Sequence, residues 1–284
     1  MRKRVYTFVL YVAMAGAAIA APPEFRQAKQ LYDRTEYEAA LKLLSSATPK
    51  DAAVYILMGQ CHYMKGDPAK AVDLFQKAAA LTPQDSDTWM WLGRAYGRRA
   101  EMATIFTAPS YASKARTAME TAVQRNPQNL DAISDLFEYY LEAPGFLGGG
   151  FDKAQALAER IREIDPSEYY WAQARLAEKR KQYQTAEQQL ERAAELAPRR
   201  LIDLAKLLAR SGQYQKSEEA FRKAETLNPN FPRLLFERAS TYIQTGRNLR
   251  MAQELLKRYL QAPLTPDDPP RSEAERLLKQ ASKS

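Results

Sequence analysis

The chain has 284 residues, of which 45% are hydrophobic and 27% are charged, and its formal net charge is +8. This composition excludes an intrinsically disordered protein and a protein that crosses a membrane over most of its length. Because Cys61 is the only cysteine, an internal disulfide is excluded as well.

The first 20 residues differ from the rest of the chain and have the features of a secretory signal peptide. Residues 2–4 are basic, residues 5–20 form an apolar run, and small side chains precede a cleavage point between Ala20 and Ala21. The apolar run is short for a transmembrane helix, which needs about 20 apolar residues. We therefore expect residues 1–20 to be removed from an exported protein that is periplasmic or secreted. An uncleaved N-terminal membrane anchor is the alternative.

From Pro23 onward, apolar residues recur with the spacing of amphipathic helices, and these helices come in pairs. In the second pair, Gly66-Asp67-Pro68 separates the two helices and Pro83 ends the second one. The residues that carry the pattern of this pair are Tyr55, Met58, Gly59, His62, Ala71, Phe75 and Ala78. Small residues at Gly59 and Ala71 allow the two helices to approach closely, so the pair is predicted to form a compact hairpin.

Similar hairpins are expected along the whole chain after residue 23. They start near Pro23, Ala52, Ser86, Leu130, Pro166, Arg199 and Asn230. Closing prolines lie at positions 83, 127, 166, 198 and 229, so successive units are 44, 39, 32 and 31 residues apart. In the fourth unit Phe137 replaces the usual small residue, and we expect that hairpin to pack more loosely or to shift. After a proline-rich stretch, residues 271–279 are predicted to form one more helix, with Ala274 and Leu277 facing inward.

This pattern resembles the tetratricopeptide repeat, whose period is about 34 residues. The resemblance covers nearly all of the chain that follows the signal peptide. It implies an all-α fold, a right-handed superhelical α-solenoid of about seven helix–turn–helix repeats. The array is expected over residues 23–262, and a C-terminal capping helix and tail over residues 263–284.

Two repeats are predicted to have long loops between their helices, over residues 98–114 and 142–153. Their large apolar residues include Ile105, Phe106, Phe146 and Leu147. Because turns within the repeats lie along one edge of the array, we expect this edge to contribute to partner binding, with mutual padding of the two loops as the alternative. Gly148-Gly149-Gly150 lacks the Gly-Lys-Ser/Thr of a nucleotide-binding loop, so we interpret it as an ordered turn.

In tetratricopeptide proteins the first helix of each repeat lines a concave groove, so the resemblance implies a partner-binding surface there. Carried over to this chain, the groove residues are Tyr63, Met90, Arg94, Trp171, Arg175, Lys179, Lys206, Arg210 and Phe236. Apolar anchors that alternate with cations suit an extended peptide or a helix of a partner protein. The paired Lys and Asn with which some family members grip a C-terminal carboxylate are not matched in this chain.

The sequence contains no recognisable catalytic or metal-binding set. His62 is the only histidine, and its neighbour Cys61 points about 100° away around the predicted helix, which is poor geometry for a thiol nucleophile. Zinc needs three or four ligands, and these are the only two soft ones. We expect Cys61 to be a buried free thiol and His62 to be a packing residue. An acidic stripe is interpreted as a solvated face, with cation or basic-partner binding as the alternative; it comprises Asp131, Asp135, Glu138 and Glu142.

The sequence therefore predicts a non-catalytic scaffold, without cofactor or metal, that binds a peptide segment or partner protein through its groove in the periplasm or cell envelope. An accessory, chaperone-like subunit of an envelope protein-assembly machine is the alternative, and a thiol-dependent enzyme is the least favoured. Nucleic acid is not an expected partner, because exported proteins rarely meet it. Without residues 1–20 the net charge would be +8 − 3 = +5, which leaves open peripheral association with an anionic membrane or an envelope complex.

Overall fold

The computed structural model describes residues 23–48 and 50–282, so the expected signal peptide and the cleavage point between Ala20 and Ala21 lie outside the described residues. The described ranges are built from α-helices and two short 3-10 helices. The α-helices are α1 (Pro23–Asp33), α2 (Tyr37–Ser46), α3 (Ala52–Met64), α4 (Pro68–Leu81), α5 (Ser86–Met102), α6 (Ala108–Arg125), α7 (Leu130–Glu142), α8 (Phe151–Arg162), α9 (Pro166–Lys179), α10 (Tyr183–Leu196), α11 (Leu201–Arg210), α12 (Tyr214–Leu227), α13 (Pro232–Thr245), α14 (Leu249–Gln261) and α15 (Arg271–Ala281). The 3-10 helices are η1 (Gly145–Leu147) and η2 (Pro198–Arg200).

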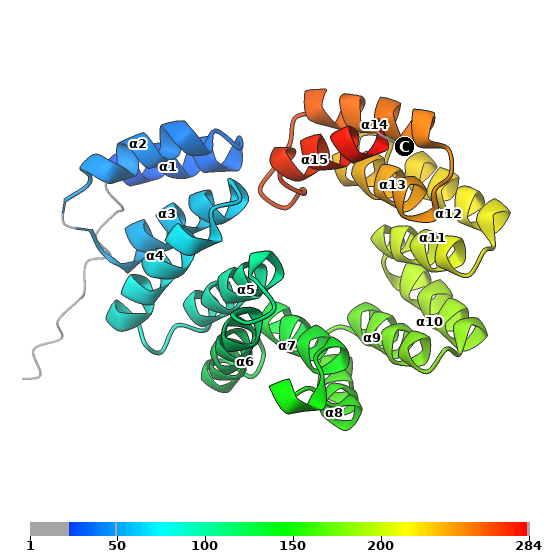
Figure 1. Ribbon diagram of the computed structural model, residues 1–284, viewed down its shortest axis with the longest axis horizontal. Helices are drawn as coiled ribbons and strands as arrows, with labels where there is room; N and C mark the ends of the chain where they lie inside the picture. The colour runs from blue at the N-terminus through cyan, green and yellow to red at the C-terminus, as the bar shows by residue number, and fades with distance from the viewer. Residues whose placement is uncertain (1–22, 49, 283–284) are drawn as a thin grey trace, which may run out of the picture.

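Helices α1 to α14 form successive helix–turn–helix pairs that stack side by side into a curved array (Figure 1). From α5 to α14, the odd-numbered helices lie on the inner side of the curve and the even-numbered helices on the outer side. The array is an α-solenoid, as the sequence predicts. The first helix of every pair begins within two residues of its expected start, the largest differences being Leu201 for Arg199 and Pro232 for Asn230.

Local side-chain chemistry fixes where these helices begin and end. Asp51 accepts a hydrogen bond from the backbone N–H of Val54 at 2.9 Å, and Asn129 accepts one from Ala132 at 3.1 Å. These caps satisfy N–H groups that have no partner in the first turn of α3 and α7. Beyond the C-terminus of α3, Gly66 adopts a φ of +79°, a conformation that glycine tolerates at no steric cost, and directs the chain into α4.

The hairpins are held together by a small residue that faces a large one where the two helices cross. In the α3–α4 hairpin, a methyl group added at Gly59 would lie 2.7 Å from the ring of Phe75. In the α5–α6 hairpin, a methyl group added at Gly93 would lie 2.7 Å from the Met119 side chain. Both glycines therefore provide the space that the larger side chain fills.

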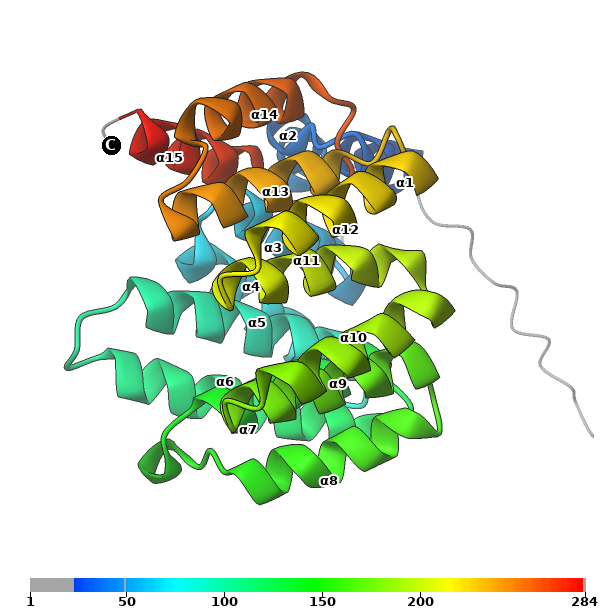
Figure 2. The same ribbon diagram turned by 90° about the vertical axis from the view of Figure 1, so that its right-hand side faces the viewer.

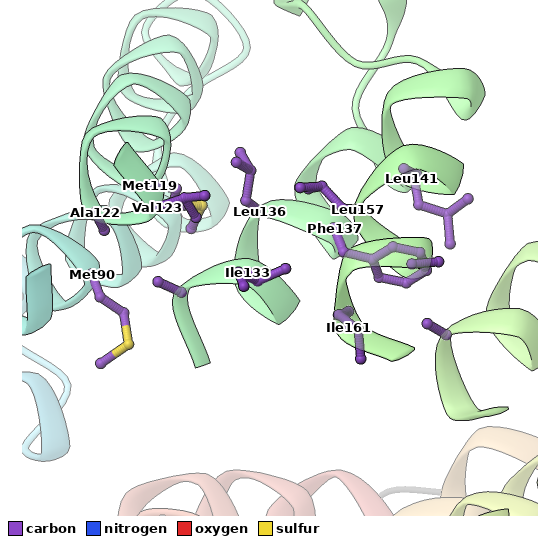
Figure 3. Packing of buried hydrophobic residues seen from close by; sticks show 14 of the residues in the cluster. Met90, Met119, Ala122, Val123, Ile133, Leu136, Phe137, Leu141, Leu157 and Ile161 are labelled. Carbon is purple, nitrogen blue, oxygen red and sulfur yellow. The ribbon is translucent and has the colours of Figure 1, made fainter. Parts of the chain in front are cut away.

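The α7–α8 hairpin has the same arrangement with the sizes exchanged. Phe137 takes the glycine position in α7, and Ala158 takes the position in α8 that Phe75 has in α4; Phe137 and Ala158 are both fully buried. Figure 3 shows the Phe137 ring close to Leu157 and Ile161 of α8. The hairpin accommodates the phenylalanine because a small residue opposes it, which keeps the volume at the crossing similar.

The first predicted loop is much shorter than expected, because the flanking helices extend into it. Helix α5 continues to Met102 and α6 begins at Ala108, so most of the segment 98–114 is helical. Arg98 and Glu101 lie less than one helical turn apart and pair at 3.1 Å, and this contact supports the additional turn of α5. Only residues 103–107 lie outside the two helices.

The second predicted loop is non-helical over residues 143–150 apart from η1, and its glycines form an ordered turn. Gly148 has a φ of +86°. A methyl group added at Gly149 would lie 1.8 Å from the carbonyl oxygen of Ala143, so the chain is too close there for any larger residue. The backbone N–H of Gly150 donates to Tyr140 O at 2.8 Å and fixes the end of the turn.

The C-terminal helix α15 caps the array by packing on α13 and α14, with Ala274 and Leu277 buried as expected. It also returns towards the first repeats (Figure 1), where a methyl group added at Gly66 would lie 4.0 Å from Ser272 Oγ. The curve of the array is therefore almost closed. Within residues 23–48 and 50–282, no helix has the length and apolar character needed to cross a membrane.

Candidate functional site

Two of the predicted groove residues lie in the core and not on the concave side. Met90 is only 5% exposed and packs with Met119 and Ile133 between the third and fourth repeats. Phe236 is 7% exposed, and its ring centroid lies 5.4 Å from that of Tyr259. The prediction that these two side chains line the groove is wrong, because at these positions the side chains point towards the neighbouring helices.

Tyr63, the third aromatic groove candidate besides Trp171 and Phe236, is half-buried and packs edge-on against Trp91, with ring centroids 5.6 Å apart. Its main contacts are therefore with the next repeat. The predicted groove cations are partly exposed, and each pairs with at least one carboxylate; they are Arg94, Arg175, Lys179, Lys206 and Arg210.

The ion pairs connect successive first helices along the concave side. Arg94 of α5 donates from Nε to Asp135 of α7 at 2.6 Å and from Nη2 to Asp131 at 3.4 Å. Lys206 of α11 donates to Glu237 of α13 at 2.7 Å. Each pair links one repeat to the next, so the concave surface carries both signs of charge.

Arg175 of α9 is the centre of the largest group of ion pairs. It contacts Glu138 at 2.8 Å and Glu142 at 3.1 Å, both on α7, and Glu178 on its own helix at 2.7 Å. Burial lowers the pKa of its guanidinium, but Glu138 and Glu178 outweigh that effect and raise the pKa above the ordinary value. Arg175 is therefore held as a permanent cation that ties α9 to α7.

These contacts correct our interpretation of the acidic stripe on α7. All four of its carboxylates accept from a cation of a neighbouring helix, Asp131 and Asp135 from Arg94, and Glu138 and Glu142 from Arg175. The stripe is one half of an inter-repeat ion-pair ladder and not a free solvated face. Sequence spacing shows that the acids share one side of a helix, but the partner on the next repeat depends on the curvature of the array.

A hollow of about 440 Å³, here called the concave pocket, opens on this side between α5 and α13. Its apolar lining comes from Leu130, Trp171, Ile202 and Phe231, and charged side chains of both signs surround them. Of the groove residues predicted from the sequence, the pocket brings together Arg94 and Trp171.

Arg200 and Glu168 form the most buried ion pair of the pocket and were not predicted. Each side chain is 12% exposed, and the guanidinium of Arg200 also contacts Asp203 at 3.0 Å and lies 5.1 Å from the ring centroid of Trp171. Burial raises the pKa of Glu168, and the positive charge of Arg200 opposes that shift. One sequence signal was available: an Arg199-Arg200 doublet precedes a helix, where the helix dipole disfavours cations.

Comparison with known proteins agrees with this architecture. The tetratricopeptide repeat family matches residues 31–94 and residues 198–231. The chain contains tetratricopeptide repeats. No protein of curated function matches it in sequence.

Solved structures share the fold at low sequence identity. A thermophilic tetratricopeptide repeat protein of Thermus thermophilus has 24% identity and a TM-score of 0.53, covering 68% of this chain and 96% of its own. A tetratricopeptide repeat protein from Parabacteroides merdae has 16% identity and a TM-score of 0.59, covering 91% and 97%. The assembly chaperone of RpL4 has 13% identity and a TM-score of 0.51, covering 81% and 98%. These likenesses show the fold, and arrays of this kind generally act as interaction scaffolds.

The neighbouring Cys61 and His62 of the tetratricopeptide array do not form an activated thiol. Cys61 is fully buried, and burial raises the pKa of its thiol to about 12. Burial lowers the pKa of His62, whose Nδ1 lies 3.6 Å from Asp67. At neutral pH both groups are therefore uncharged, and a thiolate nucleophile is absent from this pair. No cluster of at least three metal-ligating side chains occurs in the part of the chain that the structure describes.

Cys61 is expected to resist thiol reagents in the native protein and to react fully once the chain is denatured. Burial both blocks access and keeps the thiol protonated. Labelling with a chromogenic disulfide, with and without denaturant, measures the difference. Rapid stoichiometric labelling of the native protein would contradict the buried position of Cys61 and reopen the thiol-enzyme alternative.

The edge-loop residues differ in their exposure. Ile105 and Phe106 in the α5–α6 turn and Phe146 in η1 are almost fully exposed, whereas Leu147 is half-buried. The second turn packs on helix α6 and not on the first turn, because α6 contacts η1 and the Arg116 side chain of α6 lies against Gly148. These contacts leave the tips of both loops uncovered.

Proposed function

We propose that this protein is a non-catalytic scaffold of the periplasm or cell envelope that binds one segment of a partner protein on its concave side. The observation that supports this most directly is the concave pocket, in which the partly buried rings of Trp171 and Phe231 offer an apolar contact. Pockets with an aromatic anchor at their centre are where binding energy concentrates in protein interfaces.

The ion-pair ladder around the pocket favours a partner segment that carries both charge signs. Each cation of the ladder is already paired with a carboxylate of another repeat, such as Arg94 with Asp135 and Arg175 with Glu138. A partner that offered only one sign of charge would leave half of this surface unmatched after desolvation. A segment with one large apolar side chain between an acidic and a basic residue matches it best.

Export is supported by residues 1–20 alone, through their basic start, apolar run and small residues before Ala21. N-terminal sequencing of the protein from its own cells tests this part of the proposal. A mature chain that begins at Ala21 is the expected result. A retained Met1 would favour the membrane anchor or a protein that is not exported.

Replacement of Trp171 with alanine is expected to weaken partner binding by ~30-fold, as for the loss of a central aromatic anchor. Binding of the full chain to an array of varied peptides provides the measurement, and the Phe231→Ala variant tests the same pocket from the start of α13. The matched control is Leu196→Ala, because Leu196 is an exposed apolar residue at the end of outer helix α10.

One tight sequence that both pocket variants lose and the control keeps would support the scaffold. Broad binding of many aromatic-rich peptides would favour the chaperone-like alternative. Binding that neither Trp171→Ala nor Phe231→Ala changes would contradict the pocket as the site.

A further inference from the structure

The three most exposed large apolar side chains of the described residues project from one edge of the array. Phe106 is 87% exposed, Phe146 is 82% exposed and Ile105 is 81% exposed. Figure 2 shows the α5–α6 turn and η1 projecting at the same edge, which is formed by the turns within repeats. Single exposed apolar residues are common on proteins, whereas here three lie on two turns at one edge.

Hydrogen bonds beneath the tips hold these side chains outward. In the first turn, the backbone N–H groups of Thr107 and Ala108 donate to Thr104 O at 3.0 and 2.8 Å. In the second, the Tyr139 hydroxyl donates to Leu147 O at 2.9 Å. The apolar tips are therefore presented by ordered turns, and little conformational entropy is left to lose when they bind.

Three cations lie on the helices that carry these turns. Each of them contacts an aromatic ring and not a carboxylate. The Arg99 guanidinium lies 4.4 Å from the ring centroid of Tyr111, which the Lys114 ammonium also approaches, at 5.9 Å. The Lys153 ammonium lies 5.2 Å from the ring centroid of Tyr140. Among the described residues, none of these three cations pairs with a carboxylate. An aromatic ring attracts a cation without cancelling its charge, so these three cations remain positively charged beside the tips.

The concave side makes a clear contrast, because its cations are neutralised by the ion-pair ladder. Arg94, for example, lies against Asp135 and Asp131. Positive charge that no carboxylate neutralises is therefore present beside the exposed apolar tips. The two features occur together on the same turns, Arg99 shortly before the first tip and Lys153 after the second.

We propose that this edge docks on an anionic lipid bilayer, with Ile105, Phe106 and Phe146 inserted among the acyl chains and the nearby cations at the headgroups. Apolar side chains on separate projecting tips, bordered by cations, match a surface with an apolar interior and negative headgroups. An apolar anchor between two proteins is instead usually buried in a pocket, such as the concave pocket proposed above as a binding site. The proposal goes beyond the scaffold function, since it gives the array a fixed orientation on a membrane while the concave side stays free.

An environment-sensitive dye placed at each tip tests the insertion directly. In the full chain, Cys61→Ala removes the native thiol, and Phe106→Cys or Phe146→Cys provides one for labelling. The matched control is Leu227→Cys, because Leu227 is exposed at the end of α12, on the opposite edge (Figure 2). Vesicles of phosphatidylcholine, with and without phosphatidylglycerol, are the probes. Since the dye reports only its own surroundings, binding by residues 1–20 does not produce the signal.

The expected result is a blue shift and a several-fold rise in emission at positions 106 and 146 with phosphatidylglycerol vesicles, and no change at position 227. No response at 106 and 146, an equal response at 227, or an equal response to both vesicle types would overturn the proposal. A dye at position 106 that responds to the concave-side peptide and to neither vesicle would assign the edge to a protein partner, and would overturn it as well.

The charge requirement is tested by removing two cations from the edge. The Arg99→Gln/Lys114→Gln variant is expected to partition onto phosphatidylglycerol vesicles about fivefold more weakly for each charge removed. The Arg222→Gln/Lys223→Gln variant carries the same change in net charge on the outer helix α12 and is expected to bind as the parent does. An equal loss in both variants would show a general charge effect and would contradict a specific edge. Circular dichroism confirms that each variant is folded.

Discussion

Replacement of Arg200 with alanine is expected to lower the free energy of unfolding by about 3–5 kcal/mol at neutral pH. Arg200 and Glu168 are both almost buried, so the variant leaves a carboxylate in the concave pocket without its cation. Ser134 still donates to Glu168 at 3.2 Å, but a single neutral hydrogen bond does not replace the ion pair. Urea denaturation followed by circular dichroism measures the loss.

The size of this loss is expected to depend on pH, and the sign follows from Glu168. Burial already raises its pKa in the folded protein, and removal of Arg200 takes away the charge that opposes the shift. A folded-state pKa above the unfolded one means that the native state binds the proton more tightly, so stability falls as pH rises through that pKa. The deficit of Arg200→Ala should therefore be largest above the raised folded-state pKa of Glu168 and shrink as pH falls towards the pKa of a glutamate in the unfolded chain.

The compensating variant distinguishes the lost ion pair from the lost contact of Arg200 with the Trp171 ring. Adding Glu168→Gln to Arg200→Ala removes the unpaired carboxylate and is expected to restore much of the stability and abolish its pH dependence. A deficit that persists unchanged in the double variant would show that the stacking of Arg200 on Trp171 is the larger contribution.

Replacement of Phe137 with alanine is expected to destabilise the array by about 3–5 kcal/mol, the usual cost of a cavity left by a buried phenylalanine. Phe137 is fully buried, it packs against Trp171 with ring centroids 5.8 Å apart, and Ala158 opposite is too small to fill the space. Thermal and urea denaturation of the variant measure the effect.

The exchanged sizes in the α7–α8 hairpin provide a sharper test of this packing. Phe137→Gly together with Ala158→Phe recreates the arrangement of the α3–α4 hairpin, where Gly59 faces Phe75. The double variant is expected to lose less free energy of unfolding than the two single variants lose in sum, since the two side chains fill the same space. Strict additivity would contradict the exchange of sizes between the two helices.

The repeat architecture could be predicted from the sequence because its signals are local. Glycine and alanine at the helix crossing, larger residues one turn away and a closing proline recur along the chain, and they place the helix starts within two residues. Even the large residue at Phe137 can be explained from the sequence, because the small Ala158 takes the position in α8 that Phe75 has in α4. These features depend only on the contact between two consecutive helices.

The concave side was harder to predict because its contacts join different repeats. A rotation of about 100° per residue separates a groove position from a core position, so a small error of register placed Met90 and Phe236 on the wrong side. The partners of Arg94 and Arg175 on α7 lie 41 and 37 residues away in sequence, at distances set by the curvature of the array. Arg200 precedes its helix, outside the periodic pattern from which the groove was derived.

The approach of Ser272 to the Gly66 turn has a mechanical consequence. An open solenoid can extend elastically along its axis, because its two ends move independently. Here the last helix approaches the second repeat, so the two ends of the array lie side by side instead of at opposite ends of a rod. A polypeptide bound on the inner surface, as proposed above, would leave either by withdrawal of a free end or between the last helix and the second repeat.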